Sequence, residues 1–327
     1  MKIIIDAMSG DNAPEAIVRG AALAVKTLDC ELTLVGKEDV IRTVLEKENL
    51  SSRNISIINA SEVITMEDEP TRAVRSKKDS SMVVATTLVK QDYNSVCISA
   101  GNTGALLTSA LFNTGRIKGI SRPALAVILP ADRPILLIDG GANAECKSEY
   151  FVQFARIATV YMSEYYNIKN PRVALANIGV EEHKGTALYS QTYQMLKADE
   201  KINFVGNVEG TNFFTDVCDI IVADGFTGNI ILKTVEGTFK HTMSMMKNVF
   251  MKNIFNKLAA LVLKKELRVM KNSIDPNRVG GAIFLGVDGG VIKIHGSSNE
   301  YAVESAVKQA ILFQEKNVLE KIKNILI

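Results

Sequence analysis

The sequence predicts a doubly wound α/β fold, in which a mostly parallel sheet carries helices on both faces. Short apolar runs alternate with amphipathic stretches of helical period along the 327 residues. Five turns rich in Gly, Asn and Asp each follow an apolar run, as at the ends of parallel strands. No internal repeat or clear linker divides the chain. We therefore expect a single compact three-layer domain over residues 1–327.

The first half begins with a strand over Lys2–Asp6 and a helix over about Pro14–Leu28, where proline suits the first helical turn. The next expected elements are strands at Glu31–Val35 and Ile55–Asn59 around a helix at Asp39–Glu48, a helix at Ser80–Gln91, a strand at Ser95–Ser99 and a helix ending near Phe112. Two further apolar runs, Ala124–Leu129 and Ile135–Asp139, are close enough to form a β-hairpin.

The second half repeats the alternation of strand and helix. Its expected elements are helices at Ser148–Tyr166 and Ala187–Lys197, and strands at Val173–Asn177, Phe204–Gly206, Ile220–Ala223, Ala282–Val287 and Gly290–His295. A last helix over Asn299–Ile325 would be capped by Ser297 or Ser298, because serine favours the N-cap position.

One segment departs from this pattern. Residues 233–271 hold nine Lys and Arg against two acidic residues, about +7 in a chain of net charge +2. Apolar residues are dense between the lysines, so we expect a basic amphipathic helical protrusion. Its apolar face would be buried in the core or a dimer interface, or would contact an anionic membrane or an acidic protein.

Composition excludes several classes of function. The four cysteines have no CxxC spacing, so a zinc site or redox pair is not expected and the thiols should be reduced, as in the cytosol. Overall charge is too small to indicate nucleic acid binding. No stretch of about 18 apolar residues predicts a transmembrane span.

The five turns indicate a site for an anion, such as phosphate. They are DAMSGD at 6–11, SAGNTG at 99–104, DGGAN at 139–143, NIGVEEHKG at 177–185 and DGFTGN at 224–229. Turns that leave parallel strands at their carboxyl ends converge on one crevice, and several of these turns open a helix whose amides favour an anion.

These motifs, together with RPA at 122–124, GNVEG at 206–210 and HGSS at 295–298, resemble the PlsX family of bacterial phosphate acyltransferases. They occur in order over residues 2–310. Ser9 stands where the family most often has glycine, which leaves a positive φ at that position open.

The resemblance implies transfer of an acyl group from acyl carrier protein to inorganic phosphate, giving acyl phosphate for phospholipid synthesis. It also implies a Rossmann-like homodimer, similar to phosphotransacetylases and isocitrate dehydrogenase-type enzymes, with no cofactor. The enzyme would be cytoplasmic and peripheral to the membrane, where a glycerol-phosphate acyltransferase uses the product.

This chemistry needs donors and a cation more than a strong base, because a thioester is already activated and its thiol has a pKa near 8.5. We expect Lys184 to be the cation for phosphate or the oxyanion. Asn229 and Asn143 would donate hydrogen bonds or cap helices. His183 and His295 would act as general acids or serve structural hydrogen bonds.

Further candidates for phosphate or acyl-donor binding lie in the glycine turns: Asp6, Gly10, Asn102, Thr103, Gly104 and Gly228. A metal is not expected, because aspartates that begin such turns more often accept bonds from their own backbone. On the protrusion, Lys264, Lys265 and Arg268 are expected to contact the acidic carrier protein, and Leu261 to contact a membrane.

Three alternatives remain on sequence grounds. A phosphotransacetylase relative would use coenzyme A in place of the carrier protein, with the same thioester chemistry. A metal-dependent dehydrogenase would need clustered acidic ligands and a cofactor loop, and GxGxxG is absent after the first strand. A membrane-docking scaffold would have no use for five polar turns.

Overall fold

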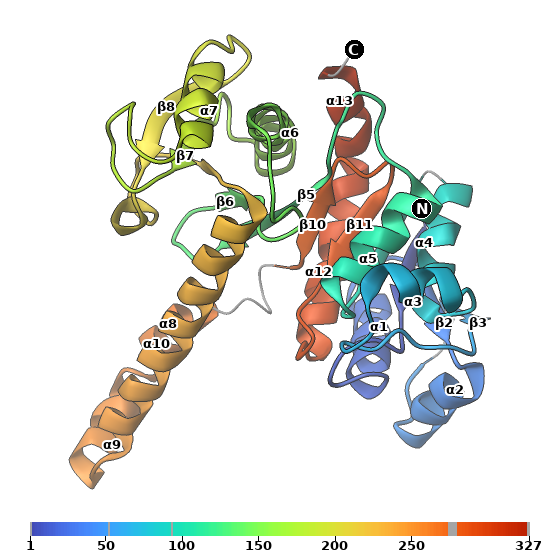
Figure 1. Cartoon of the computed structure of the whole chain (residues 1–327). Coiled ribbons are helices and arrows are strands. Elements are labelled where there is room, and N and C mark those ends of the chain that lie inside the picture. The colour runs from blue at the N-terminus through green and yellow to red at the C-terminus, as the bar shows by residue number, and fades with distance from the viewer. Residues whose placement is uncertain (1, 52, 93, 274–279, 326–327) are drawn as a thin grey trace.

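The computed structural model describes residues 2–51, 53–92, 94–273 and 280–325, without the side chains of residues 268, 269 and 271–273. One sheet of eleven strands runs through both halves of the molecule (Figure 1). In chain order the strands are β1 (Lys2–Asp6), β2 (Leu32–Gly36), β3 (Ile55–Asn59), β4 (Ser95–Ser99), β5 (Ala124–Leu129), β6 (Ile135–Ile138), β7 (Arg172–Ala176), β8 (Asn203–Val208), β9 (Ile220–Val222), β10 (Ala282–Leu285) and β11 (Gly290–Lys293).

The sheet order is β3-β2-β1-β4-β11-β10-β5-β6-β9-β7-β8. Seven of the ten strand pairs in the described chain are parallel. The three antiparallel pairs join β11 to β10, β10 to β5 and β5 to β6, which confirms the predicted hairpin. Because three reversals intervene, β6 to β9 run opposite to β1 to β4, and the carboxyl ends of the two parallel blocks lie at opposite edges.

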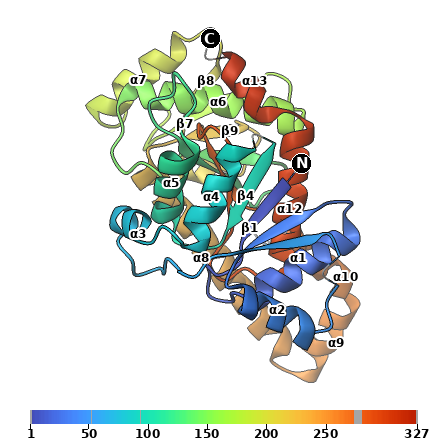
Figure 2. The ribbon, with the colours of Figure 1, turned by 90° about the vertical axis from the view of Figure 1, so that its right-hand side faces the viewer.

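The helices of the globular part cover both faces of the sheet (Figure 2). They are α1 (Glu15–Thr27), α2 (Glu38–Lys47), α3 (Pro70–Ser76), α4 (Ser81–Gln91), α5 (Thr103–Ser109), α6 (Ser148–Tyr166), α7 (Ala187–Lys197), α12 (Glu300–Glu315) and α13 (Val318–Ile325). A π-helical turn over Ala110–Thr114 continues α5, and a 3₁₀ turn over Gly210–Asn212 follows β8.

Strand alternation divides the core into layers. In β1, Ile3 and Ile5 are buried with α1, α12 and α6 on one face of the sheet, whereas Ile4 is buried with α4 and α5 on the other. A third cluster packs the second half of that other face against Ile231 and Leu232 at the base of α8 (Gly225–Met251). The predicted doubly wound three-layer architecture is therefore confirmed.

Several predicted boundaries are wrong. The last helix is broken, because Asn317 takes a positive φ of 51° between α12 and α13. Its N-cap is Asn299, whose side chain accepts a hydrogen bond from the Ala302 amide at 3.1 Å, rather than Ser297 or Ser298. Helix α3 was not expected, since its seven residues carry too short a pattern to detect.

The basic segment forms the predicted protrusion, built from the distal part of α8 with α9 (Ile254–Val262) and α10 (Lys264–Ser273). It extends away from the globular part (Figure 1). No residue of α9 is buried, and Gly225 and Gly228 at the base are the only buried residues of α8. The apolar face of the protrusion is thus outside the core of this chain.

Candidate functional site

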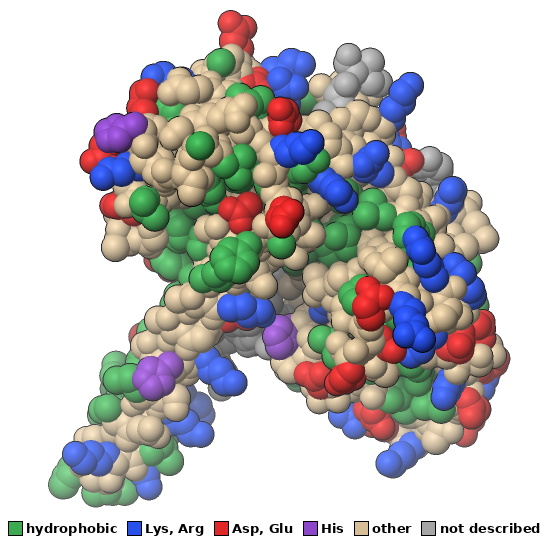
Figure 3. Space-filling view, in the orientation of Figure 1, with side chains coloured by type: hydrophobic (Ala, Val, Ile, Leu, Met, Phe, Trp, Pro, Cys, Tyr) green, Lys and Arg blue, Asp and Glu red, His purple; other side chains and the backbone are tan. Residues whose placement is uncertain are grey.

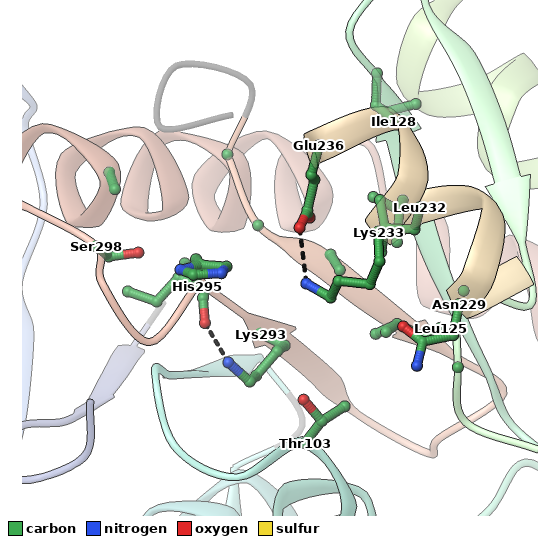
Figure 4. A pocket seen from close by; sticks show the side chains of 18 residues that line it. Thr103, Leu125, Ile128, Asn229, Leu232, Lys233, Glu236, Lys293, His295 and Ser298 are labelled. Atoms are coloured by element: carbon green, nitrogen blue, oxygen red, sulfur yellow. Dashed lines mark hydrogen bonds and ion pairs between the residues drawn. The ribbon is translucent and has the colours of Figure 1, made fainter. Parts of the chain in front are cut away.

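A cavity of about 300 Å³ lies beside the base of α8, where the two halves of the molecule meet (Figures 3 and 4). Its wall crosses β5 and β10, the strands that link the two parallel blocks. Polar and apolar residues both line it. They include Thr103, Leu125, Val127, Ile128, Gly140, Gly141, Asn229, Leu232, Lys233, Glu236, Lys293, His295 and Ser298.

Three of the five predicted turns reach this cavity: those after β4, β6 and β9. The turn after β11 also reaches it, through His295 and Ser298. The turns after β1 and β7 contribute no lining residue among those described. The expectation that all five turns share one crevice is therefore wrong: turns from both parallel blocks reach the cavity, and one turn from each block, after β1 and after β7, does not.

The turn after β4 holds Thr103 at the cavity through a local network. Asn102 caps α5 by accepting a hydrogen bond from the Ala105 amide at 3.1 Å, and its side-chain amide donates to the Met66 carbonyl at 3.1 Å. Gly104 lies against α3, because a Cβ there would be 3.0 Å from Pro70. Asn102 and Gly104 thus support the turn. Of the three predicted residues in it, Thr103 is the one that lines the cavity.

The turn after β6 is organised around Asp139. Its buried carboxylate accepts hydrogen bonds from the amides of Leu125, Gly141, Ala142 and Asn143 and from the Asn143 side chain, at 2.7 to 3.1 Å. Burial raises the pKa of Asp139, and these hydrogen bonds oppose that shift. The Asn143 amide also donates to the Pro123 carbonyl at 2.7 Å. Both of its N–H groups are thus used inside the protein, which favours the structural interpretation of Asn143.

The start of α8 packs directly on this turn and positions Asn229. Asp224 caps the helix by accepting from the Thr227 amide at 2.8 Å. A Cβ on Gly228 would lie 1.9 Å from the Asp139 carbonyl oxygen, so only glycine fits there. Asn229 then faces the cavity (Figure 4), and its side chain has no hydrogen-bond partner within the described part of the chain. Its amide is therefore free to donate to a ligand.

Lys293 is the residue that the sequence prediction missed. It ends β11, and its Nζ donates hydrogen bonds to the carbonyl oxygens of Ala100, at 3.3 Å, and Ile294. Burial lowers its pKa to about 8; the nearby Lys233 acts in the same direction, whereas Asp11 and Asp6 oppose it. The available signal was a single lysine in an otherwise apolar strand.

Lys233 supplies a second cation from α8 and forms an ion pair with Glu236 at 2.7 Å. His295 lies at the cavity, where its Nδ1 is 2.7 Å from the Ser297 hydroxyl. The cavity thus presents two ammonium groups, an imidazole and a free amide. Leu125, Val127, Ile128 and Leu232 form an apolar wall.

The turn after β1 supports the cavity from behind. Asp6 is buried and accepts hydrogen bonds from the Ser99 hydroxyl at 2.7 Å and the Met8 amide at 3.3 Å. Gly10 has a φ of 111°, and a Cβ on it would lie 2.8 Å from that of Ala100. Ser9 is not among the residues of positive φ. The turn therefore needs glycine at residue 10 but tolerates serine at residue 9.

Lys184 and His183 lie in the turn after β7, away from the cavity lining. The Lys184 Nζ is 4.0 Å from a carboxylate oxygen of Glu181, and its carbonyl accepts from the Asn177 side chain at 3.0 Å. His183 is exposed. Their catalytic roles stay predictions.

On the protrusion, Lys264, Lys265 and Leu261 are exposed, the last with 64% of its surface accessible. The side chain of Arg268 lies outside the described residues. None of the described helices is long and apolar enough to cross a bilayer. Within the same described residues, no three His, Cys, Asp or Glu side chains cluster as metal ligands would.

The chain is similar to proteins of one family along almost its whole length. A family model described as fatty acid synthesis protein matches residues 1–321. Phosphate acyltransferase from Acetivibrio thermocellus is 46% identical over 325 residues, covering 99% of this chain and 96% of that protein. The phosphate acyltransferase from Clostridioides difficile is 45% identical over 324 residues, covering 98% and 95%.

Solved structures show the same fold at low sequence identity. A phosphotransacetylase from Streptococcus pyogenes aligns with a TM-score of 0.64 at 16% identity, covering 98% of this chain and 94% of that one. The EutD phosphotransacetylase from Staphylococcus aureus gives 0.59 at 15% identity, covering 95% and 94%. Match length and identity together place this chain in the PlsX family of fatty acid synthesis proteins, whose curated relatives are phosphate acyltransferases.

Proposed function

We propose that this protein transfers a fatty acyl group from acyl carrier protein to inorganic phosphate, giving acyl phosphate for phospholipid synthesis. The observation that carries the proposal is the mixed polar and apolar lining of the cavity. Lys233, Lys293 and Asn229 offer cations and a donor for phosphate and the oxyanion, while Leu125 and Val127 belong to an apolar wall suited to an acyl chain.

The reaction needs no covalent acyl-enzyme. A phosphate oxygen attacks the thioester carbonyl, a C–O bond forms, and the C–S bond breaks with its electron pair leaving on sulfur as thiolate. Asn229 would donate to the carbonyl oxygen as it becomes negative. Among the described residues no cysteine lines the cavity, and burial raises the pKa of Cys146, which follows the turn after β6, to about 12. Direct attack by phosphate is therefore favoured over attack by a protein thiol.

The protrusion supports a proposal for the partners. Its apolar side chains are exposed beside lysines, as in helices that lie on anionic membranes. Lys264 and Lys265 would also attract an acidic carrier protein. We infer a cytoplasmic enzyme, peripheral to the membrane, that delivers acyl phosphate to a membrane glycerol-phosphate acyltransferase.

A homodimer is part of this proposal. Large apolar side chains of the second half of the molecule are exposed, including Ile178, Val180, Phe214, Phe226 and Ile230. Monomers rarely leave so much apolar surface in water, and a second copy of the chain would cover it. Sedimentation equilibrium gives the mass, and a purely monomeric species at micromolar concentration would contradict the dimer.

The function is tested by thiol release from palmitoyl-acyl carrier protein, with and without inorganic phosphate, using purified protein treated with a chelator. Phosphate-dependent release that yields acyl phosphate is expected. Release without phosphate would indicate a thioesterase. Turnover of palmitoyl-coenzyme A alone would instead support the phosphotransacetylase alternative.

A further inference from the structure

We propose that the Nζ of Lys293, in the cavity that Thr103 and Lys233 also line, is the cation that holds the attacking inorganic phosphate. This inference rests on the proposed function, because it assigns a residue to one of its two substrates. It differs from the sequence prediction, which gave the cation role to Lys184. Three observations on the cavity carry it.

The first observation is the position of the ammonium group. Lys293 is at the carboxyl end of β11, beside the end of β4, in register with Ser99. Its backbone is fixed on both sides, because Lys293 pairs with β4 on one side and with β10 on the other. Figure 4 shows Lys293 between Thr103 and His295, with its Nζ directed at the carbonyl oxygen of Ile294. A cation on a central strand is held more firmly than one on a loop.

The second observation is its hydrogen bonding. An ammonium group carries three N–H donors. Two of them bind the carbonyl oxygens of Ala100 and Ile294, and among the described residues no carboxylate lies within ion-pair distance of Lys293. The two carbonyls orient the group without neutralising it. One donor and the full charge therefore remain for an anionic ligand.

The third observation is the arrangement of charges around it. Lys233 from α8 faces the same cavity and repels Lys293, although Glu236 neutralises part of that charge. Asp6 and Asp11 lie behind, on the side of the β1 turn, and His295 follows Lys293 by two residues. A phosphate between the two lysines would relieve their repulsion, whereas an uncharged ligand would not.

The arrangement predicts a pH limit on phosphate use. Burial lowers the pKa of Lys293 to about 8, so the free site loses its charge above that pH. Phosphate is already dianionic there, because its second ionisation lies near neutrality. A fall in kcat/KM for phosphate above about pH 8 would therefore reflect the loss of a proton from the enzyme and not from phosphate. A bound phosphate stabilises the ammonium, so kcat should fall at a higher pH than kcat/KM.

The experiment compares the wild type with Lys293→Gln, Lys293→Arg and the exposed control Lys118→Gln. Initial rates are measured with varied phosphate and with varied palmitoyl-acyl carrier protein, from pH 6.5 to 9.5. We expect Lys293→Gln to raise KM for phosphate about 10- to 100-fold, the usual loss for a charged hydrogen bond, with little change in KM for the carrier protein. Lys293→Arg should retain phosphate binding and lose the alkaline limb, because guanidinium stays charged.

An unchanged KM for phosphate in Lys293→Gln would overturn the inference, and so would a loss confined to kcat, which would place Lys293 at the oxyanion instead. An alkaline limb retained in Lys293→Arg would also overturn it. If Lys293→Gln does not fold, as judged by its melting temperature, Lys293→Arg and the wild-type pH profile decide.

Failure of the proposed function gives a different result. In that case the wild type releases no thiol in response to phosphate at any pH. Isothermal titration of the wild type and Lys293→Gln with inorganic phosphate alone then tests the site without turnover. Weaker phosphate binding by Lys293→Gln supports the site, and equal binding rejects it.

Discussion

At the scale of single residues, the carboxylate of Asp139 holds the turn that closes one side of the cavity. It is fully buried and accepts five hydrogen bonds, four of them from backbone amides. Removing it would leave several buried N–H groups without an acceptor, and each such group costs about 1–3 kcal/mol.

We expect Asp139→Ala to lower the free energy of unfolding by about 3 kcal/mol or more, measured by urea denaturation. The exposed Asp29→Ala is the matched control, and it should change stability by no more than about 0.5 kcal/mol. Equal stability of the two variants would show that the Asp139 network is dispensable.

Asn229 can act as a hydrogen-bond donor to a ligand because its side-chain amide is not used within the described part of the protein. Its amide has no partner within the described chain and borders the cavity. Asn229→Ala should lower kcat about 10²- to 10³-fold with an unchanged melting temperature, as expected for loss of one oxyanion donor. Asn248→Ala, an exposed asparagine of the same helix, should retain wild-type activity. Activity of Asn229→Ala within twofold of wild type would exclude the donor role.

At the scale of elements, the contact of α8 with the turn after β6 decides the shape of the cavity. Gly225 and Gly228 lie against the backbone of that turn, where a Cβ would be 2.5 Å from the Asn143 carbonyl oxygen and 1.9 Å from that of Asp139. The helix can start in this place only because both residues lack a side chain.

Gly228→Ala should therefore push α8 away from the turn and lower both stability and activity. The matched control is Gly237→Ala in the same helix, where a Cβ meets nothing within 4 Å. That control should gain about 0.5–1 kcal/mol, since alanine favours a helix. Thermal melting measures the stability of the two variants, and thiol release measures their activity. A stabilised, active Gly228→Ala would disprove the close contact.

The protrusion is the second element with a clear prediction. Ile254, Phe255, Leu258, Leu261 and Val262 on α9 are each more than half exposed. Leu261→Glu should reduce co-sedimentation with phosphatidylglycerol vesicles at least several-fold, because it puts a charge on the apolar face and repels anionic lipid. Thr238→Glu adds the same charge nearer the base of α8 and should bind normally. Undiminished binding by Leu261→Glu would contradict membrane contact through the apolar face of α9.

At the scale of the whole molecule, a charge network joins separate segments of the sheet. The Asp219 carboxylate, just before β9, accepts from the Arg133 guanidinium of the hairpin loop at 2.8 Å and from that of Arg172 on β7 at 3.0 Å. Burial raises the pKa of Asp219, but hydrogen bonds and charge from the two arginines outweigh it and hold the pKa below its usual value.

A carboxyl with a depressed pKa contributes stability that is present above its unfolded pKa of about 3.9 and is lost as pH falls through the folded value. Asp219→Asn should thus cost about 2 kcal/mol at pH 7, and the difference from the wild type should shrink below about pH 4. Urea unfolding at pH 7, 5 and 3.5 measures it. A difference that stays constant with pH would exclude an ionic contribution.

Much of this architecture could be predicted from the sequence. The apolar runs match the strands within one or two residues, because burial on both faces leaves few polar positions, as in Ser95–Ser99, which is buried throughout. The motif turns predicted the family and placed Thr103 and Asn229 at a site. Asn143 shows the limit: its residue type suits a donor, but Asp139 and Pro123 occupy both of its N–H groups.

By itself, the sequence determined the α/β class, the family and the basic protrusion, since each depends on local periodicity, motif order or charge density along the chain. Only the tertiary structure decided which turns share a cavity and brought Lys293 into it. Strand direction is set by pairing between distant segments, and the antiparallel pairing of β10 with β5 cannot be seen in any local pattern. The charge state of Lys293 likewise depends on burial and on Lys233, 60 residues away in the chain, because desolvation and Coulomb interactions act through space.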